Sequence, residues 1–257
     1  MAATRRTDLG RLRAYRRAQY GVVTTRAEPF AHGTAFFHPA HPAKWDLNLL
    51  LVDSSDGVGA AELMAEAERL QAPARLRHRK IELLRGGDEL VEAFEAAGWW
   101  SDKLAIMVLD PASDRRGDAP ASVREAGFDA VRSLAEQWYR EGMSAAEARD
   151  LVEADADVAR MRPTRFFLAE RAGEPAAYCM LLGDDGIGEV ESVYTSAAHR
   201  GGGLASAVVR AAIAASRERG DDLITIAADA ADWPQRLYER LGVRTIDTRR
   251  AFTRKPS

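Results

Sequence analysis

The sequence predicts a mixed α/β (α+β) protein built from two tandem copies of one fold, each a β-sheet flanked by helices. Predicted strands and helices alternate along the 257 residues. Between the two halves, Asp110–Pro120 combines proline, glycine and charged residues and cannot bury apolar surface. We therefore expect one domain over residues 1–110, a linker over 111–119 and a second domain over 120–257.

The main sign of duplication is a glycine turn, helix, strand and helix that occur twice with one constant offset of 144 residues and no gap. The residue pairs at this offset are Gly59 and Gly203, Asp88 and Asp232, Phe94 and Tyr238, and Gly98 and Gly242. The aligned segments carry the same predicted elements. We interpret them as two copies of one fold and not as one domain with an insertion.

Arginines crowd the first segment of the N-terminal half, where Leu9, Leu12 and Tyr15 recur at roughly helical spacing. We expect a domain helix whose arginine face is solvated, with an arm for nucleic acid or membrane as the alternative. The arginines are Arg5, Arg6, Arg11, Arg13, Arg16 and Arg17. Later elements are extended segments at 24–27 and 33–38 around Glu28-Pro29, a strand at 44–53, a helix at 59–70, a strand at 77–84, a helix at 89–97 and extended chain at 99–109.

The C-terminal half predicts a longer series of elements. They are a strand at 122–126, helices at 128–141 and 145–160, strands at 165–171 and 175–182 that face each other across Ala172-Gly173-Glu174, a strand through Val190–Thr195, a helix from the glycines at 201–203 to Arg219, a strand at 222–228, a helix at 233–241 and extended chain to Lys255. In the last helix, Asp232 is the expected N-cap.

Composition fits an ordinary soluble globular protein, with 46% hydrophobic and 29% charged residues and a formal net charge of -3. That charge gives no general reason to expect a nucleic-acid partner. No apolar run reaches membrane-spanning length, and the N-terminus M-A-A-T-R-R lacks the apolar core of a signal peptide. We therefore expect a cytoplasmic monomer or homodimer without a membrane partner.

The cysteine and histidine content gives little support to disulfide or metal chemistry. Cys179 is the single cysteine, which rules out an intramolecular disulfide. Its apolar neighbours favour a buried strand thiol over a catalytic nucleophile. His38-x-x-His41 lies between prolines without further ligands, so no metal is expected.

Three consecutive glycines, Gly201, Gly202 and Gly203, open an apolar helix after a strand and a short loop. A helix N-terminus presents unpaired N–H groups and the positive end of its dipole, and glycines leave that backbone open to a ligand. Arg200 adds a permanent positive charge at the mouth of the turn. The stretch therefore predicts a site for a phosphate or diphosphate.

Other interpretations of the glycine turn are weaker. One alternative is a glycine turn that joins the strand to the helix and binds no ligand. A dinucleotide-binding turn would need a third glycine where Ser206 stands, and Asp221 precedes its strand instead of ending it. A P-loop is excluded because no Gly-Lys-Ser/Thr follows.

The segment Arg200-x-x-Gly203-x-Ala205, preceded by a strand that ends in Val-Tyr-Thr, resembles the acyl-CoA-binding motif of the GNAT N-acetyltransferase superfamily. Leu237-Tyr238-Glu239-Arg240-Leu241-Gly242 resembles the L-Y-x-x-x-G segment that follows it in these enzymes. The resemblance implies a splayed, twisted mixed sheet that holds acetyl-CoA in a V-shaped opening. The cofactor-binding residues it implies are Val193, Tyr194, Thr195, Arg200, Gly201, Gly202, Gly203, Leu204, Ala205 and Asp232. The asparagine often found before the last helix is absent, with Ala231 or Asp232 there instead.

The resemblance also implies direct acyl transfer to an amine. An alkyl ammonium must lose its proton before it attacks, so a base or a water chain is needed. Glu189 and Glu191 lie two residues apart on a strand, hence on one face, and are candidate bases or merely structural glutamates. The resemblance makes Glu189 the first choice, because some members of the family carry a base eleven residues before the motif arginine, here Arg200. Backbone N–H groups at Val193–Thr195 are candidate donors to the oxyanion, and Tyr238 is a candidate acid for the CoA thiolate or a core residue.

The N-terminal copy lacks these groups. At the constant offset, Asp56 stands opposite Arg200 and Phe94 opposite Tyr238, while Trp45 and Leu47 stand opposite the two glutamates. A carboxylate in place of the arginine would repel a polyphosphate. We therefore expect a degenerate, non-catalytic N-terminal copy.

The working hypothesis is an acetyl-CoA-dependent N-acetyltransferase acting on a small-molecule or peptide amine, without a metal. The alternative is a CoA-binding sensor or interaction module that has lost its chemistry. Candidate walls of the acceptor pocket are Gln137, Trp138, Tyr139, Glu141, Arg165 and Phe166.

Overall fold

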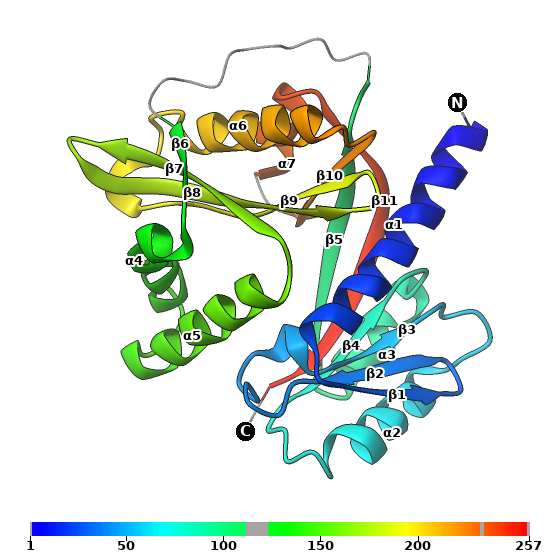
Figure 1. Cartoon of the computed structure of the whole chain (residues 1–257). Helices are drawn as coiled ribbons and strands as arrows, with labels where there is room; N and C mark the ends of the chain where they lie inside the picture. The colour runs from blue at the N-terminus through cyan, green and yellow to red at the C-terminus, as the bar shows by residue number, and fades with distance from the viewer. Residues whose placement is uncertain (1, 112–122, 232–233, 256–257) are drawn as a thin grey trace. The chain divides into compact units, whose positions relative to one another are not determined.

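The structure is a computed structural model that describes residues 2–111, 123–231 and 234–255 (Figure 1). The predicted linker residues 112–119 and Asp232 lie outside the described residues. The N-terminal elements are α1 (Ala2–Val23), β1 (Arg26–Phe30), β2 (Gly33–Phe37), the 3-10 helix η1 (Trp45–Leu47), β3 (Leu49–Val52), α2 (Ala60–Gln71), β4 (Arg79–Leu83), η2 (Asp88–Leu90), α3 (Val91–Ala96) and β5 (Trp100–Leu109).

The C-terminal elements follow the predicted series closely. They are β6 (Val123–Ala126), α4 (Phe128–Arg140), α5 (Ala145–Met161), β7 (Thr164–Arg171), β8 (Glu174–Asp184), β9 (Ile187–Thr195), η3 (Ala197–His199), α6 (Leu204–Arg219), β10 (Leu223–Asp229), α7 (Pro234–Arg240) and β11 (Val243–Arg254). In the described residues the strands form an 11-stranded mixed sheet in the order β1-β2-β3-β4-β11-β5-β10-β9-β8-β7-β6. The predicted mixed α/β class is confirmed at this level.

Contacts divide the chain into two units. The N-terminal unit comprises Met1–Ala105, Asp229–Ala231 and Asp247–Ser257, and the C-terminal unit comprises Ile106–Ala228 and Asp232–Ile246. Strands β5 and β11 therefore each contribute residues to both units.

Each unit is completed by a strand from the other half of the sequence. In the N-terminal unit, β11 pairs antiparallel with β4 through Arg254↔Arg79 and Arg250↔Leu83. In the C-terminal unit, β5 is the neighbour of β10, and Thr225 Oγ1 donates to the Met107 carbonyl at 2.8 Å. A strand from late in the sequence thus pairs with β4, and β5 from the first half lies beside β10.

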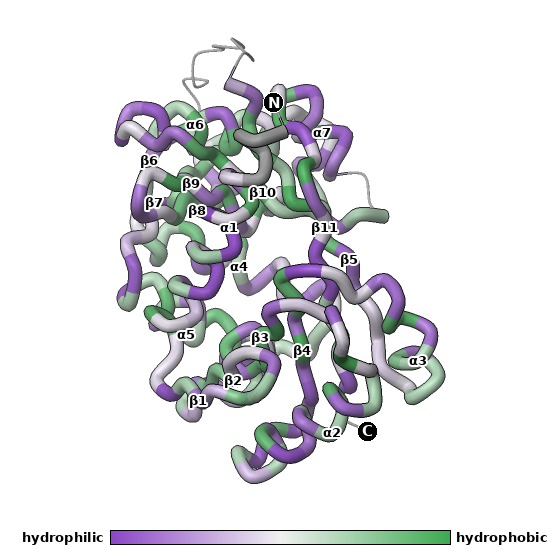
Figure 2. Tube along the Cα trace, turned by 90° about the vertical axis from the view of Figure 1, so that its right-hand side faces the viewer, coloured by the Kyte–Doolittle hydropathy of each residue, from purple (hydrophilic) through white to green (hydrophobic). Residues whose placement is uncertain are grey.

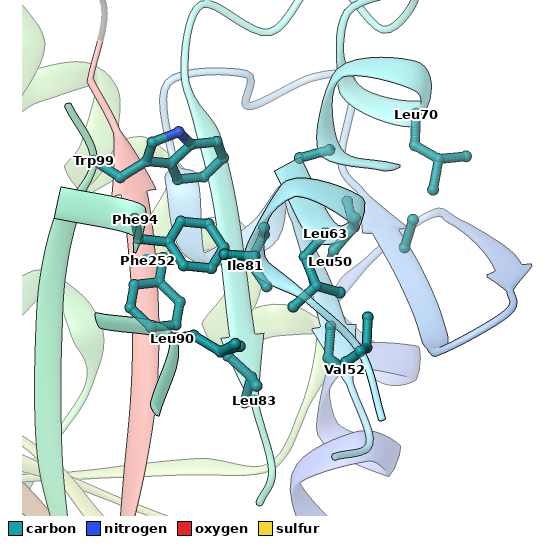
Figure 3. Close-up of a cluster of buried hydrophobic side chains, with 14 of the residues drawn as sticks. Leu50, Val52, Leu63, Leu70, Ile81, Leu83, Leu90, Phe94, Trp99 and Phe252 are labelled. Carbon is teal, nitrogen blue, oxygen red and sulfur yellow. The ribbon is translucent and has the colours of Figure 1, made fainter. Parts of the chain in front are cut away.

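The core of the N-terminal unit lies between the sheet and α2 and α3 (Figure 3). Side chains alternate along β3, so Leu50 and Val52 face α2 while Leu49 and Leu51 face the other way. Phe94 of α3 stacks on Phe252 of β11 with ring centroids 3.9 Å apart and an interplanar angle of 8°. Full burial of two aromatic rings is worth several kcal/mol, about 1.5 to 3 for each, so β11 is firmly held in this unit.

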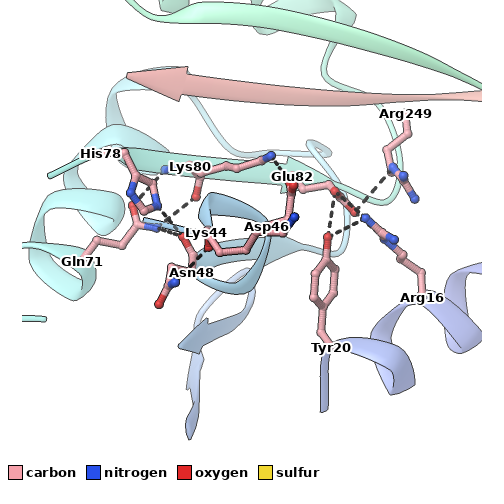
Figure 4. A network of polar contacts seen from close by, with 10 residues as sticks. All are labelled: Arg16, Tyr20, Lys44, Asp46, Asn48, Gln71, His78, Lys80, Glu82 and Arg249. Atoms are coloured by element: carbon pink, nitrogen blue, oxygen red, sulfur yellow. Dashed lines mark hydrogen bonds and ion pairs between the residues drawn. The ribbon is translucent and has the colours of Figure 1, made fainter. Parts of the chain in front are cut away.

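Helix α1 covers the opposite face through ion pairs (Figure 4). Buried Glu82 of β4 accepts from Arg16 Nε at 3.2 Å and from the Tyr20 hydroxyl at 2.9 Å, and Arg249 lies 3.5 Å away. Burial alone would raise the pKa of Glu82, but the Arg16 and Arg249 guanidiniums outweigh it and lower the pKa to about 2. The carboxylate is therefore kept charged inside the unit.

The expectation of a solvated arginine face on α1 is wrong at three positions. Arg13 pairs with Asp247 at 2.8 Å, Arg17 pairs with Asp53, and Arg16 holds the Glu82 carboxylate. Helical spacing shows which residues share a face, but it does not show that the facing strand offers carboxylates.

Two other expectations for this half are corrected. Pro29 lies inside β1 and not between two segments, which an edge strand tolerates. Of the strand expected at 44–53, only Leu49–Val52 is extended, because η1 precedes it. The Asn48 side chain accepts from the His38 N–H at 2.9 Å and donates to the His41 and Lys44 carbonyls, which satisfies the backbone of that turn.

In the C-terminal unit, α4 and α5 lie on one face of β7–β9 and α6 on the other (Figure 1). The hydrophobic trace of α6, mostly green in Figure 2, packs on the sheet, and Val209 and Ile213 line a small cavity with Val190 of β9. On the α4 side, Val131 and Leu134 pack on Leu168 and Tyr178. The Ser144 hydroxyl and the Glu147 carboxylate form a capping box that starts α5.

Strand β9 contains a bulge. Tyr178↔Tyr194 and Met180↔Glu191 are paired, so one residue of β8 faces two of β9. Ser192 lies there in a left-handed conformation with φ 53°. The extra residue places Glu191 and Tyr194 on the same face of the sheet, although they are three positions apart.

The expected match of Trp45 and Leu47 with the two glutamates is wrong. Trp45 and Leu47 lie in η1, ahead of the strand, whereas Glu189 and Glu191 lie within β9. The constant offset therefore does not extend back through the strand that precedes the glycine turn. The face of β3 turned away from α2 carries Leu49 and Leu51, so it too lacks carboxylates.

Candidate functional site

The glycine turn forms the N-terminus of α6. Gly201 has φ 79° and Gly203, the N-cap, has φ 78°, a conformation that residues with a side chain adopt only with strain. The first turn of α6 contains no acidic residue. The four leading N–H groups of a helix have no intrahelical acceptor, so this end can receive an anion. In the same turn, Leu204 is buried and Ala205 is half-buried.

Arg200 is anchored to the protein and does not point freely from the turn. Its Nε donates to the Thr195 carbonyl at 3.1 Å and its Nη2 pairs with Glu141 of the α4 end. The guanidinium also lies over the Tyr194 ring, 5.9 Å from the centroid. These contacts join the end of β9, the glycine turn and α4.

The end of β9 leads into this turn with its pairing to β10 already finished. The parallel pairs with β10 run from Ile187↔Leu223 to Val190↔Ile226, and β9 continues to Thr195. Val193 and Thr195 are half-buried, and Tyr194 is buried. Burial raises the pKa of the Tyr194 hydroxyl, and its 3.0 Å hydrogen bond to Glu141 adds to the effect.

The two candidate bases lie on the α4 side of β9. Glu189 is buried, opposite Leu182 of β8 and Thr225 of β10. Glu191 is the first residue beyond the last pair with β10, and its carboxylate lies 3.7 Å from Arg162 Nη2. The expectation that they share a face agrees with this register.

Tyr238 is a buried residue of α7. Burial raises the pKa of its hydroxyl well above the usual 10, and Cys179 makes a smaller contribution. The phenol therefore keeps its proton at neutral pH and can act as a donor. Cys179 is fully buried, its thiol donates to the Val208 carbonyl at 3.3 Å, and burial raises its pKa, so the predicted buried strand thiol is confirmed.

Residues 128–243 match the model of the Acetyltransferase (GNAT) family. This C-terminal region belongs to the GNAT acetyltransferase family. No curated protein matches the chain. Among solved structures, a functionally unknown conserved protein from Staphylococcus epidermidis is 11% identical with a TM-score of 0.74, over 91% of this chain and 95% of its own. A GCN5-related N-acetyltransferase from Kribbella flavida is 20% identical with a TM-score of 0.65, over 95% of both chains. One from Sphaerobacter thermophilus is 16% identical with a TM-score of 0.53, over 77% and 68%. At these identities, the similarity to the three structures shows a shared fold only.

Within the GNAT region, the α4 end forms an aromatic surface beside Tyr194. Trp138 is 38% exposed and stacks on Tyr194, with ring centroids 6.0 Å apart. The Tyr139 hydroxyl donates to Asp155 at 2.7 Å. Trp138, Tyr139 and Glu141, three of the expected acceptor walls, are therefore close to the end of β9.

Two of the other expected walls, Arg165 and Phe166, do not join this surface. Arg165 pairs with Glu125 at 2.8 Å and donates to the Ala215 carbonyl of α6, so it lies on the opposite face of the sheet. Phe166 is part of the buried core beneath α4, and Gln137 is exposed. Alternation along β7 separates Arg165 from Phe166, a consequence of strand geometry that the expected grouping overlooked.

A second arginine, Arg171, lies at the glycine turn of the GNAT region and was not singled out from the sequence. It is the last residue of β7, and a Cβ placed on Gly202 would lie 2.9 Å from its Nη2. The guanidinium therefore lies beside the Gly202 backbone. The contact joins segments that are distant in the sequence, so no local sequence pattern predicts it.

The described residues contain no group of three or more His, Cys, Asp or Glu side chains arranged to hold a metal ion. His38 and His41 stack on each other with ring centroids 4.7 Å apart. None of the helices in the described ranges has the length and apolar character needed to cross a bilayer.

Proposed function

We propose that the C-terminal unit transfers an acetyl group from acetyl-CoA to the primary amine of a small molecule or peptide, by direct attack in a ternary complex. One observation carries this proposal: β9 leaves β10 after Val190 and runs on to Thr195, directly ahead of the glycine turn. The chain thus first offers an unpaired strand edge, at the end of β9, for the thioester end of acetyl-CoA. It then offers the N-terminus of α6 for the diphosphate. Both lie in the region that matches the GNAT model.

The phosphates of acetyl-CoA would bind the N–H groups from Gly201 to Ala205, where the α6 dipole favours negative charge. The thioester carbonyl would accept from N–H groups of Val193–Thr195. Fixed donors of this kind stabilise the oxyanion that forms when the amine attacks, typically by about 3 kcal/mol for each donor.

The attacking amine needs a base, and Glu191 and Glu189 are the candidates. Glu191 stands at the first position past the last β9–β10 pair and is partly exposed, whereas Glu189 is buried opposite Thr225. The C–N bond forms as the amine attacks the carbonyl carbon, and the amine proton passes to the carboxylate or to water. The C–S bond then breaks.

The departing thiolate of CoA needs a proton, and Tyr238 is the proposed donor. Its buried phenol, with a raised pKa, holds the proton at neutral pH and would release it to the sulfur as the C–S bond breaks. Asp232, also expected near the cofactor, lies outside the described residues.

The test is thiol release from acetyl-CoA over a panel of primary amines, with CoA binding measured by calorimetry on the intact protein. We expect heat from CoA binding and amine-dependent release of free thiol. Absence of CoA binding would overturn the proposal.

The alternative is a CoA-binding sensor or interaction module without catalysis. It is favoured by the state of the two carboxylates, because Glu191 is ion-paired with Arg162 and Glu189 is buried. CoA binding without thiol release from any amine would support this alternative.

We further propose that the N-terminal unit is a degenerate, non-catalytic copy. Phe94, fully buried, occupies the position of Tyr238 and brings no hydroxyl. Asp56 replaces Arg200 and pairs with Arg85, and Leu49 and Leu51 face away from α2 where acidic residues would be needed.

A further inference from the structure

Arg171 projects from the tight turn that joins β7 to β8. Ala172 and Gly173 have φ values of 52° and 83°, as in a two-residue hairpin turn, and Arg171 is paired in register with Glu174. The side chain reaches Gly202, close enough for a Cβ there to stand 2.9 Å from its Nη2. A strand end on one side of the glycine turn thus places a guanidinium over it.

The two arginines at this turn differ in their contacts. Arg200 is held by the Thr195 carbonyl, by Glu141 and by the Tyr194 ring. Within the described part of the chain, neither a hydrogen bond nor an ion pair engages the exposed Arg171 guanidinium. An anion on the glycine turn would therefore gain Arg171 without breaking any contact, whereas Arg200 would first have to leave Glu141.

We propose that Arg171, which lies outside the glycine motif, supplies the side-chain positive charge that binds the diphosphate of acetyl-CoA. Arg200 is instead a positioning residue that fixes the end of β9 against α4. This inference rests on the proposed function, because the diphosphate is placed on α6 by that proposal. A guanidinium offers two parallel N–H donors to phosphate oxygens, and such charge-assisted hydrogen bonds are the strong ones.

Gly202 fits the same arrangement. Unlike its two neighbours it does not have a positive φ, so its backbone conformation is open to other residues. A side chain there would meet the Arg171 guanidinium instead. Glycine at this position thus keeps both the backbone and the arginine available to one ligand.

The test compares Arg171→Gln with Arg165→Gln by calorimetry against acetyl-CoA. Arg165 is on the same strand, but its guanidinium is already paired with Glu125, so its variant controls for the loss of one charge from β7. We expect Arg171→Gln to weaken acetyl-CoA binding about tenfold, the size of one charged hydrogen bond, with Arg165→Gln within about twofold of the wild type. Arg171→Lys should recover part of the loss.

Truncated ligands locate the effect. S-acetylpantetheine lacks the diphosphate and should bind wild type and Arg171→Gln equally, whereas acetyl-3′-dephospho-CoA keeps the diphosphate and should show the full tenfold difference. Loss of the difference with the dephospho ligand would mean that Arg171 binds the 3′-phosphate and would overturn the proposal. Equal acetyl-CoA affinity of Arg171→Gln and wild type would overturn it as well.

The outcomes also separate this inference from the proposed function. If wild-type protein binds acetyl-CoA and Arg171→Gln binds it equally well, the role of Arg171 alone fails. If wild-type protein binds no acetyl-CoA, both fail together.

Discussion

The two units build the same series of strand pairs, yet their matching faces carry different chemistry. In the N-terminal unit β1-β2 and β2-β3 are antiparallel and β3-β4 parallel, and in the C-terminal unit β7-β8 and β8-β9 are antiparallel and β9-β10 parallel. In the first, a helix covers one face through the buried Glu82 network. In the second, that face carries Glu191 and Tyr194 at a strand end. Shared topology therefore does not imply shared function, which depends on the side chains at a few positions.

The largest expected effect is on turnover, and it comes from the Tyr238 hydroxyl, which Phe94 of the N-terminal unit lacks. Tyr238→Phe should lower turnover at least about 100-fold, the range for loss of a general acid, while acetyl-CoA affinity stays within about twofold. Thiol release and calorimetry measure the two quantities. Tyr20→Phe is the matched control, because it removes a buried hydroxyl from the N-terminal unit and should leave turnover unchanged. Wild-type turnover in Tyr238→Phe would remove its role as acid.

The second prediction concerns the charge network that distinguishes the N-terminal unit. Glu82→Gln leaves Arg16 and Arg249 without their buried carboxylate and should lower the free energy of unfolding by about 3 kcal/mol. Urea unfolding of the full chain measures it.

The control for this variant is Glu66→Gln, the same change in an exposed ion pair with Arg69. It should cost less than about 0.5 kcal/mol. Equal stability of the two variants would show that the network does not hold α1 on the sheet.

The sequence predicts the helices better than the strands around the site. The helix expected at 59–70 is found at Ala60–Gln71, because hydrophobic period and a glycine start mark it. The bulge at Ser192 carries no glycine and no special residue, so nothing local announces it. Register of β9 against β8 is fixed by tertiary packing, and only that register shows that Tyr194 and Glu191 share a face.

The glycine turn itself was predictable, but its surroundings were not. Glycine permits the positive φ found at Gly201 and Gly203. The pairing of Arg200 with Glu141 and the approach of Arg171 to Gly202 join distant segments. Such contacts depend on which strand end and which helix end meet, and a single sequence does not contain that information directly.

The third prediction concerns the pH dependence of stability that His78 gives to the N-terminal unit. Burial lowers the pKa of His78, in the N-terminal unit, to about 4, and its Nε2 donates to the Asn48 carbonyl at 2.9 Å. Between pH 6.5 and 4 the unfolded chain binds a proton that the folded His78 does not, so stability falls as pH falls, by up to about 1.4 kcal/mol for each pH unit. Glu82, with its lowered pKa, adds a further loss between pH 4.5 and 2.

Urea unfolding at pH 7, 5.5 and 4.5 tests the histidine term, with His78→Gln as the comparison. The variant should show a flatter loss of stability over this range, because it has no imidazole to protonate. The same slope in both proteins would mean that His78 is protonated equally in the folded and unfolded states.

The smallest expected effect tests whether the N-terminal unit takes part in catalysis at all. Asp56 is 72% exposed and pairs with Arg85, and the offset of 144 residues in the sequence matches it with Arg200. Asp56→Arg puts the motif charge into the first glycine turn, but Phe94 and the leucines of β3 still lack the catalytic groups, so turnover and acetyl-CoA affinity should change less than about twofold. An exposed ion pair contributes little, so the fold should tolerate the change. Binding of a second acetyl-CoA molecule by the variant would show that the Asp56 carboxylate alone keeps this ligand out of the N-terminal unit. A marked loss of turnover would show that the N-terminal unit contributes to the reaction.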